Sequence, residues 1–250
     1  METTLCAKIV LIVGILALLS FPKLATCEPF YAAALGEAYD KRYTTVYDVL
    51  TYDNNRIQYD ISKINELITP QSVVLDIGCG RGHHVGALPN AVGLDLSKDM
   101  IAAARSRYPT KHFVEGDAHD RWVFMNATVT HVLVLYYTIY CFPNKHKVFQ
   151  NIIYWLQPGG TCLLHVADQL EYGTTSVKRS NLQYTQRQHD TELYESFVIG
   201  NTKQKYKHRI YFESYQTILD LVKQVGFIIT AEYAYPKSPA QHLIVLQKPF

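Results

Sequence analysis

The sequence VVLDIGCGRGHHVGAL, residues 73–88, decides the fold of this chain. Its apolar run ends in Asp76, and glycine then recurs at Gly78, Gly80 and Gly82. Successive apolar residues are typical of a strand buried on both faces, and glycines let the backbone pass close to a ligand. The segment therefore predicts a buried strand, a ligand-binding loop and a helix whose first N–H groups can meet acceptor groups on that ligand.

The spacing of these glycines separates the nucleotide-binding motifs. A dinucleotide-binding loop requires the pattern G-x-G-x-x-G, and His83 occupies its last position here. A phosphate-binding loop requires Gly-Lys-Ser or Gly-Lys-Thr, and neither follows. The pattern is instead D-x-G-x-G-x-G, from Asp76 to Gly82. A dinucleotide-dependent oxidoreductase is therefore the less favoured alternative.

This pattern after an apolar strand resembles motif I of the class I S-adenosylmethionine-dependent methyltransferases. Residues 92–95 read as a second strand that ends in an acid nineteen positions after the first, where doubly wound folds place the carboxylate that accepts ribose hydroxyls. Residues 113–118 resemble the third strand of the family and the acid that follows it. Residues 131–135 read as a fourth strand, and residues 161–166 resemble the fifth. The resemblance covers residues 73–166.

The resemblance implies an α/β fold: a Rossmann-like, doubly wound, seven-stranded and mostly parallel sheet. It implies S-adenosyl-L-methionine as the cofactor, with Asp95 on the ribose, Met100 packed against adenine and Asp117 accepting the adenine amino group. Met100 also suits ordinary core packing in a helix capped by Ser97. The cofactor-binding residues that it implies are Asp76, Gly78, Gly80, Gly82, Asp95, Leu96, Met100, Asp117 and Ala118.

Methyl transfer from a sulfonium is an in-line displacement, which mainly requires donor and acceptor to be held in near-attack geometry. A general base helps if the acceptor has a proton to lose, and the ends of strands four and five point toward the site of an open α/β sheet. Tyr137 and His165 are the catalytic candidates at these ends. The alternative for His165 is an ordinary strand residue. The ten histidines show no metal-ligand spacing, so no metal is expected.

The front of the chain carries thirteen residues without a charge, 9–21. As a helix at ~1.5 Å per residue they span about 20 Å, short of the ~30 Å hydrocarbon core of a bilayer. Residues 1–27 therefore read as a signal peptide, with small residues near Cys27 for cleavage. One alternative is an uncleaved membrane anchor, because the side chains of Lys8 and Lys23 can reach the membrane surface from the ends of the segment. Another alternative is a helix buried in the core of the protein. The expected location is a membrane or the secretory pathway.

Residues 28–69 form the next expected region. Apolar residues at helical spacing, such as Ile57, Ile61 and Ile64, predict a helix that packs on the sheet. Tyrosines precede it, and family members often fold such a segment over the cofactor. Tyr43 or Tyr47 is therefore a candidate lid residue. The alternative is ordinary packing between helix faces.

Residues 70–250 form the expected methyltransferase domain. An insertion follows strand five, at residues 167–212, and its segments 193–199 and 205–212 resemble a β-hairpin around Gly200-Asn201. Additions at this place in the family commonly build the substrate pocket. The helix 215–225 and two terminal strands complete the fold.

Composition bounds the partners of the chain. The formal net charge of 250 residues is +2, too small to indicate a nucleic-acid partner. Five cysteines show no spacing of a zinc site or a disulfide framework. We therefore expect an enzyme that methylates a small-molecule acceptor and contacts a membrane if residues 1–27 are retained. The alternative is a membrane-anchored protein that binds the cofactor without transferring its methyl group. The oligomeric state stays open.

Overall fold

The computed structural model describes residues 31–32, 39–168, 175–179, 182–189, 192–199 and 202–250. These residues belong to one compact unit, 31–250. The expected signal or anchor segment, residues 1–27, lies outside the described residues. Within the described part of the chain, no helix combines the length and the apolar character needed to cross a bilayer.

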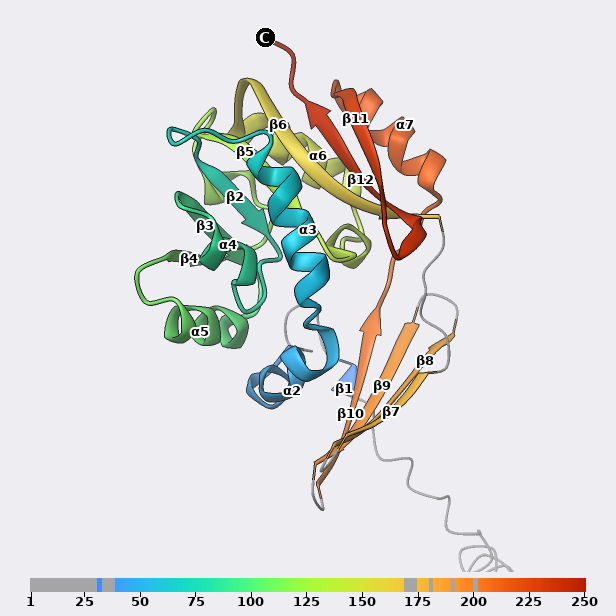
Figure 1. The fold of residues 1–250 in the computed structure, drawn as a ribbon. Coiled ribbons are helices and arrows are strands. Elements are labelled where there is room, and N and C mark those ends of the chain that lie inside the picture. The colour runs from blue at the N-terminus through green and yellow to red at the C-terminus, as the bar shows by residue number, and fades with distance from the viewer. Residues whose placement is uncertain (1–30, 33–38, 169–174, 180–181, 190–191, 200–201) are drawn as a thin grey trace, which may run out of the picture. The chain divides into compact units, whose positions relative to one another are not determined.

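A seven-stranded sheet forms the centre of the molecule, in the order β11-β12-β6-β5-β2-β3-β4 (Figure 1). Strands β2 to β6 pair in parallel, and β12 pairs antiparallel with both β6 and β11. The strand bounds are β2 Val74–Ile77, β3 Ala91–Asp95, β4 His112–Glu115, β5 Val129–Val134, β6 Leu156–Ala167, β11 Ile228–Tyr235 and β12 Ser238–Gln247. The expected doubly wound, mostly parallel sheet is confirmed. Because β3 and β5 flank β2 on opposite sides, the topology predicts a ligand crevice at the carboxyl end of β2.

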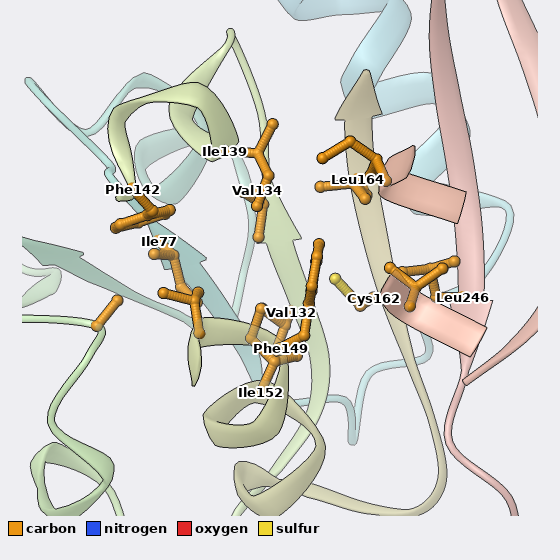
Figure 2. Close-up of a cluster of buried hydrophobic side chains, with 14 of the residues drawn as sticks. Ile77, Val132, Val134, Ile139, Phe142, Phe149, Ile152, Cys162, Leu164 and Leu246 are labelled. Atoms are coloured by element: carbon orange, nitrogen blue, oxygen red, sulfur yellow. The ribbon is translucent and has the colours of Figure 1, made fainter. Parts of the chain in front are cut away.

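Helices cover both faces of this sheet. Alternate strand residues point to opposite faces, so Val74 of β2 joins one buried cluster and Leu75 the other. Helices α3, α4 and α5 pack on the face of Val74, and α6 and α7 pack on the face of Leu75. Figure 2 shows Phe149 and Ile152 of α6 beside Val132 of β5. The bounds are α3 Asn54–Asn65, α4 His83–Ala87, α5 Lys98–Arg107, α6 Lys145–Trp155 and α7 Tyr215–Val225.

Caps fix where these helices begin and end. The side chain of Ser97 accepts a hydrogen bond from the N–H of Met100 and starts α5, as expected. Asp53 caps α3 in the same way through Asn55. Gly226 adopts a left-handed conformation and ends α7.

A second, five-stranded sheet has the order β1-β10-β9-β8-β7. The expected hairpin is present as β9 and β10, but its bounds were wrong: β10 ends at Arg209, and two further antiparallel strands extend the sheet beyond the hairpin. The polar residues of these strands lack the clear apolar alternation that marks a strand in sequence. The bounds are β1 Tyr31–Ala32, β7 Thr175–Arg179, β8 Leu182–His189, β9 Glu192–Ile199 and β10 Thr202–Arg209.

Helix α2, Lys41–Thr51, occupies the tyrosine-rich segment before α3. Its N-cap is Asp40, whose side chain accepts hydrogen bonds from two backbone N–H groups. Tyr43 and Val46 of α2 share a buried cluster with Phe197 of the second sheet and with Met100 of α5. The helix therefore joins the second sheet to the strand-end region of the central sheet.

Candidate active site

The glycine loop after β2 adopts left-handed backbone conformations. The φ angles are +68° at Gly78, +52° at Gly80 and +77° at Gly82, and glycine adopts such angles without a Cβ clash. Gly78 N–H donates to the carbonyl of Leu94 at 2.8 Å, which joins the loop to β3. A Cβ on Gly78 would lie 2.5 Å from Cγ2 of Thr138. The loop therefore needs glycine at this position.

Asp95 at the end of β3 organises the same loop. Its Oδ2 accepts from Gly80 N–H at 2.8 Å, and its Oδ1 accepts from Ser97 N–H at 2.8 Å. Burial raises the pKa of Asp95 above its ordinary value, although the two hydrogen bonds favour the carboxylate. The carboxylate thus lies fixed between the glycine loop and the start of α5.

A pocket opens at the carboxyl ends of β2, β3 and β4. Seven of the nine cofactor-binding candidates line it, whereas Asp76 and Gly82 do not. Gly82 is the N-cap of α4, and a Cβ there would lie 2.6 Å from the ring of Phe113. The lining residues are Tyr39, Tyr47, Ile77, Gly78, Gly80, Leu94, Asp95, Leu96, Met100, Gly116, Asp117, Ala118, Tyr136, Thr138, Cys141 and Phe142.

Asp76 instead borders a second pocket, which shares Tyr47, Gly78 and Tyr136 with the first. The Asp76 side chain is buried, and among the described residues its Oδ2 has no hydrogen-bond partner. Burial raises the pKa of Asp76 to about 7; the nearby carboxylates add to the shift and His84 opposes it. An unpartnered buried acceptor of this kind suits a donor or a cation on a ligand.

The carboxylate of Asp48 on α2 contacts three basic side chains, of which Arg81 and His83 border the second pocket. Asp48 lies 3.0 Å from Nη1 of Arg81, 2.9 Å from Nε2 of His83 and 2.6 Å from Nη1 of Arg107. Burial alone would raise the pKa of Asp48, but these neighbours lower it. Asp48 thereby fastens α2 to the glycine loop and to α5.

The lid candidates differ in position. Tyr47 borders both pockets, and its hydroxyl lies 3.5 Å from the position of a Cβ on Gly80. Tyr43 points to the second sheet, where its hydroxyl donates to Glu195 at 2.8 Å. Tyr39, which also lines the first pocket, packs on His208 with 5.0 Å between ring centroids.

The two catalytic candidates lie beside each other, with 4.7 Å between the rings of Tyr137 and His165. Neither lines a pocket described above, although Tyr136 lines both. Sequence reasoning missed Tyr136, Thr138, Cys141 and Phe142 as lining residues. Their signal was the run that directly follows the fourth strand, since loops at that edge of the sheet surround the crevice.

Residues 74–160 match the family model of a methyltransferase domain. The matched segment makes up about one third of the chain. It contains every predicted cofactor-binding residue and excludes Tyr39 and Tyr47, which complete the pocket from α2 and the residues before it.

Curated relatives match less than half of this chain. A trans-aconitate 2-methyltransferase of Rhodopseudomonas palustris (strain BisB18) is 34% identical over 113 residues, 39% of this chain and 40% of that protein. One of Sinorhizobium medicae (strain WSM419) is 29% identical over 127 residues, 46% of this chain and 45% of that protein. The chain therefore spans less than half the length of these relatives.

Solved structures share the fold over most of the chain. A S-adenosylmethionine-dependent methyltransferase from Clostridium acetobutylicum has a TM-score of 0.69 at 15% identity and covers 84% of this chain and 98% of its own. The S-adenosylmethionine-bound amino pentose methyltransferase CalS10 from Micromonospora echinaspora has a TM-score of 0.65 at 17% identity, with the same coverages. Residues 74–160 thus lie within a Rossmann-like α/β fold that these solved methyltransferases share, which confirms the expected fold class.

Proposed function

We propose that this protein transfers a methyl group from S-adenosyl-L-methionine to a small-molecule acceptor. The observation that carries the proposal is the first pocket: Asp95 and the left-handed glycine loop meet there, within the segment that matches a methyltransferase domain. The proposal is supported by the solved methyltransferases that share this fold.

The residues present fit this cofactor. Asp95 suits the ribose hydroxyls, Asp117 suits the adenine amino group, and Met100 and Ala118 offer apolar contacts for adenine. The unpartnered oxygen of Asp76 in the adjoining pocket suits the ammonium of the amino-acid end. Arg81 and His83 border that pocket as well and suit its carboxylate.

Binding and orientation are the contributions that we assign to the chain. Bound S-adenosylmethionine supplies an electrophilic methyl group on a positively charged sulfur. Tyr39, Tyr47 and Tyr136 border the first pocket, and the faces of aromatic rings attract cations. Because Tyr137 and His165 do not border it, we assign neither of them the role of general base and propose that proximity carries the transfer.

The acceptor side of the site is part of the same proposal. The named activity of the curated relatives is methylation of trans-aconitate, but their similarity covers less than half of this chain. We propose that α2 and the second sheet complete the acceptor pocket. Tyr39 supports this arrangement because it borders the first pocket and packs on His208 of β10.

For the front of the chain we propose that residues 1–27 direct the protein to a membrane or the secretory pathway. The charge-free run 9–21 supports this. Amino-terminal sequencing of the protein recovered from cells distinguishes a cleaved signal from a retained anchor. Fractionation of cells expressing the intact chain or the chain from residue 28 tests the location, and equal soluble recovery of both would refute it.

Calorimetry and a methylation assay on the intact protein test the transferase. We expect binding of S-adenosylmethionine, and a labelled methyl group appearing in a small product when a metabolite extract is added. Mass spectrometry then identifies the acceptor, with heat-inactivated protein as the control. Binding without a labelled product would favour a cofactor-binding protein that lacks transferase activity. Absence of binding would refute the proposal itself.

A further inference from the structure

Two consecutive tyrosines after β5 adopt left-handed backbone conformations. The φ angle is +52° at Tyr136 and +61° at Tyr137. Non-glycine residues are strained in this region, and such strain persists where the surrounding structure holds the backbone in place. The turn matters for the site because Tyr136 lines both pockets.

The guanidinium of Arg56 on α3 packs on the ring of Tyr136. Its guanidinium carbon lies 4.5 Å from the ring centroid of Tyr136 and 4.5 Å from that of Tyr235 on β11. A guanidinium in contact with two aromatic faces is attracted by both rings and loses side-chain freedom. Arg56 therefore fixes the position of the Tyr136 ring relative to the end of β11.

Arg56 reaches the second tyrosine through polar contacts. Tyr137 backbone N–H donates to Nδ1 of His165 at 2.9 Å, which places the imidazole proton on Nε2. Nε2–H then donates to Oε1 of Gln241 at 3.1 Å, and Nη1 of Arg56 donates to the same oxygen at 2.8 Å. Nη2 of Arg56 lies 2.8 Å from Nε2 of His165. With the proton on Nε2 this last approach joins two donors and is not a hydrogen bond, so Arg56 of α3 holds the imidazole through Gln241 of β12.

The surroundings of His165 keep its imidazole neutral. Burial and the neighbouring Arg56 hold the pKa of His165 well below its ordinary value, so the ring stays neutral and its Nδ1 remains an acceptor. Tyr235, whose ring also contacts Arg56, donates its hydroxyl hydrogen to the buried carboxylate of Asp60 at 2.7 Å. A neutral imidazole places no second positive charge beside the guanidinium.

We propose that Arg56 is a positioning residue for the cofactor site. It clamps the ring of Tyr136 directly and the backbone of Tyr137 through His165, and so maintains the left-handed turn that places Tyr136 in the wall of both pockets. This assignment gives His165 the role of a neutral support for the turn. Testing the role of Arg56 through cofactor affinity rests on the proposed function.

Substitution of Arg56 by lysine tests the clamp, because lysine retains the charge but loses the planar group that contacts two rings. We expect the dissociation constant and the KM for S-adenosylmethionine to rise about tenfold with a smaller change in kcat, since fewer molecules hold the binding-competent turn. Arg121→Lys is the matched control: Arg121 also lies over a tyrosine ring, 4.8 Å from the centroid of Tyr154, but lines neither pocket.

Two readouts separate positioning from general stability. Added guanidinium, at concentrations well below those that unfold proteins, should restore cofactor binding to Arg56→Ala and leave Arg121→Ala unchanged. Hydrogen exchange at the Tyr137 amide should accelerate in Arg56→Lys without any cofactor present, because its acceptor on His165 is no longer held. The intact wild-type chain serves as reference in both.

The outcomes distinguish this inference from the proposed function. A wild-type protein that binds no S-adenosylmethionine refutes the function and leaves amide exchange as the test of the clamp. Unchanged exchange at Tyr137 in Arg56→Lys overturns the clamp. A lowered unfolding temperature with unchanged affinity and KM also overturns it, because the role of Arg56 would then be structural alone.

Discussion

Asp95 and Gly80 act as one unit: the carboxylate of Asp95 accepts the backbone N–H of Gly80 at 2.8 Å. The acid at the end of β3 thus holds the glycine loop at the end of β2, and both border the first pocket. Any ligand in this pocket meets a loop that is already shaped by the neighbouring strand.

Replacing Asp95 with alanine removes both the loop contact and the acceptor that we assign to the ribose. A hydrogen bond to a charged group contributes about 1.5–3 kcal/mol, so we expect cofactor affinity to fall by roughly tenfold to hundredfold. Calorimetry on intact protein measures this. Asp220→Ala, which changes an exposed carboxylate on α7, should bind as the wild type does. Equal affinity of the two variants would count against Asp95 as a ligand.

Asp76→Asn should change how stability depends on pH. The pKa of Asp76 is about 7 in the folded protein against a reference of 3.8, so its stabilising contribution is present below pH ~4 and is lost as the pH rises through 7. We expect asparagine to gain stability over the wild type across this window, by up to about 4 kcal/mol at pH 8. Urea unfolding without cofactor at pH 5 and pH 8 measures the difference. An equal difference in unfolding free energy between the two proteins at both pH values would contradict the raised pKa of Asp76.

Ionisation of Asp76 should raise cofactor affinity, whereas it lowers the stability of the protein without cofactor. An ammonium group prefers the ionised carboxylate, so binding to the wild type should tighten as the pH rises through about 7. In Asp76→Asn this pH dependence should disappear. Calorimetry between pH 6 and pH 8 tests it, and a persistent dependence in the variant would assign the titration to another group.

Alanine at position 78 should destabilise the loop for two separable reasons. A left-handed φ costs a non-glycine residue about 1–2 kcal/mol, and the new Cβ would also clash with Thr138 at 2.5 Å. Gly80→Ala is the matched control, because its Cβ would meet Tyr47 at an ordinary 3.5 Å and only the backbone cost remains. Thr138→Ala should therefore rescue part of the loss in Gly78→Ala. Urea unfolding tests this, and identical losses at both glycines would show that the clash is relieved elsewhere.

Glu195→Gln should loosen α2 from the second sheet. The buried carboxylate accepts from the hydroxyls of Tyr43 and Tyr184 and lies 2.5 Å from Nε2 of His208. Breaking such a buried pair costs about 3 kcal/mol. Glu192→Gln, on the same strand with a surface partner, Lys207, should leave the unfolding midpoint unchanged. Equal midpoints for the two variants would refute the anchor.

Acid should act on the same anchor. Burial alone would raise the pKa of Glu195, but His208 and the tyrosines lower it below its ordinary value. Its contribution to stability is therefore present above pH ~4.5 and is lost as the pH falls through the lowered pKa. We expect the stability difference between the wild type and Glu195→Gln to shrink in acid, as measured by unfolding at pH 3 and pH 6.

Local spacing was sufficient to predict that acids and glycines from several strand ends meet at one pocket, while their contacts with a cofactor stay a prediction. Successive parallel strands end at the same edge of a sheet, so acids after strands, such as Asp95 and Asp117, meet a glycine loop without further information. The same reasoning did not predict that Asp76 borders a second pocket, or that a Cβ on Gly82 would meet the ring of Phe113.

Contacts between distant segments could not be predicted this way. Arg56 meets Gln241 across 185 positions, and Tyr43 meets Glu195 across 152. No periodicity encodes such pairs, because each depends on how two independently formed elements pack. Local reasoning also did not separate Tyr136, which borders both pockets, from Tyr137, which borders neither and whose catalytic role stays a prediction.

The attachment of helix α2 should affect the release of unreacted cofactor and the release of spent cofactor together. Tyr47 borders both pockets, while Tyr43, one turn earlier, is fastened to Glu195. Movement of this helix away from the glycine loop has to loosen that fastening. We therefore expect the hydroxyl of Tyr43 to slow the dissociation of both unreacted and spent cofactor. A change that speeds the release of spent cofactor should then also weaken the binding of unreacted cofactor.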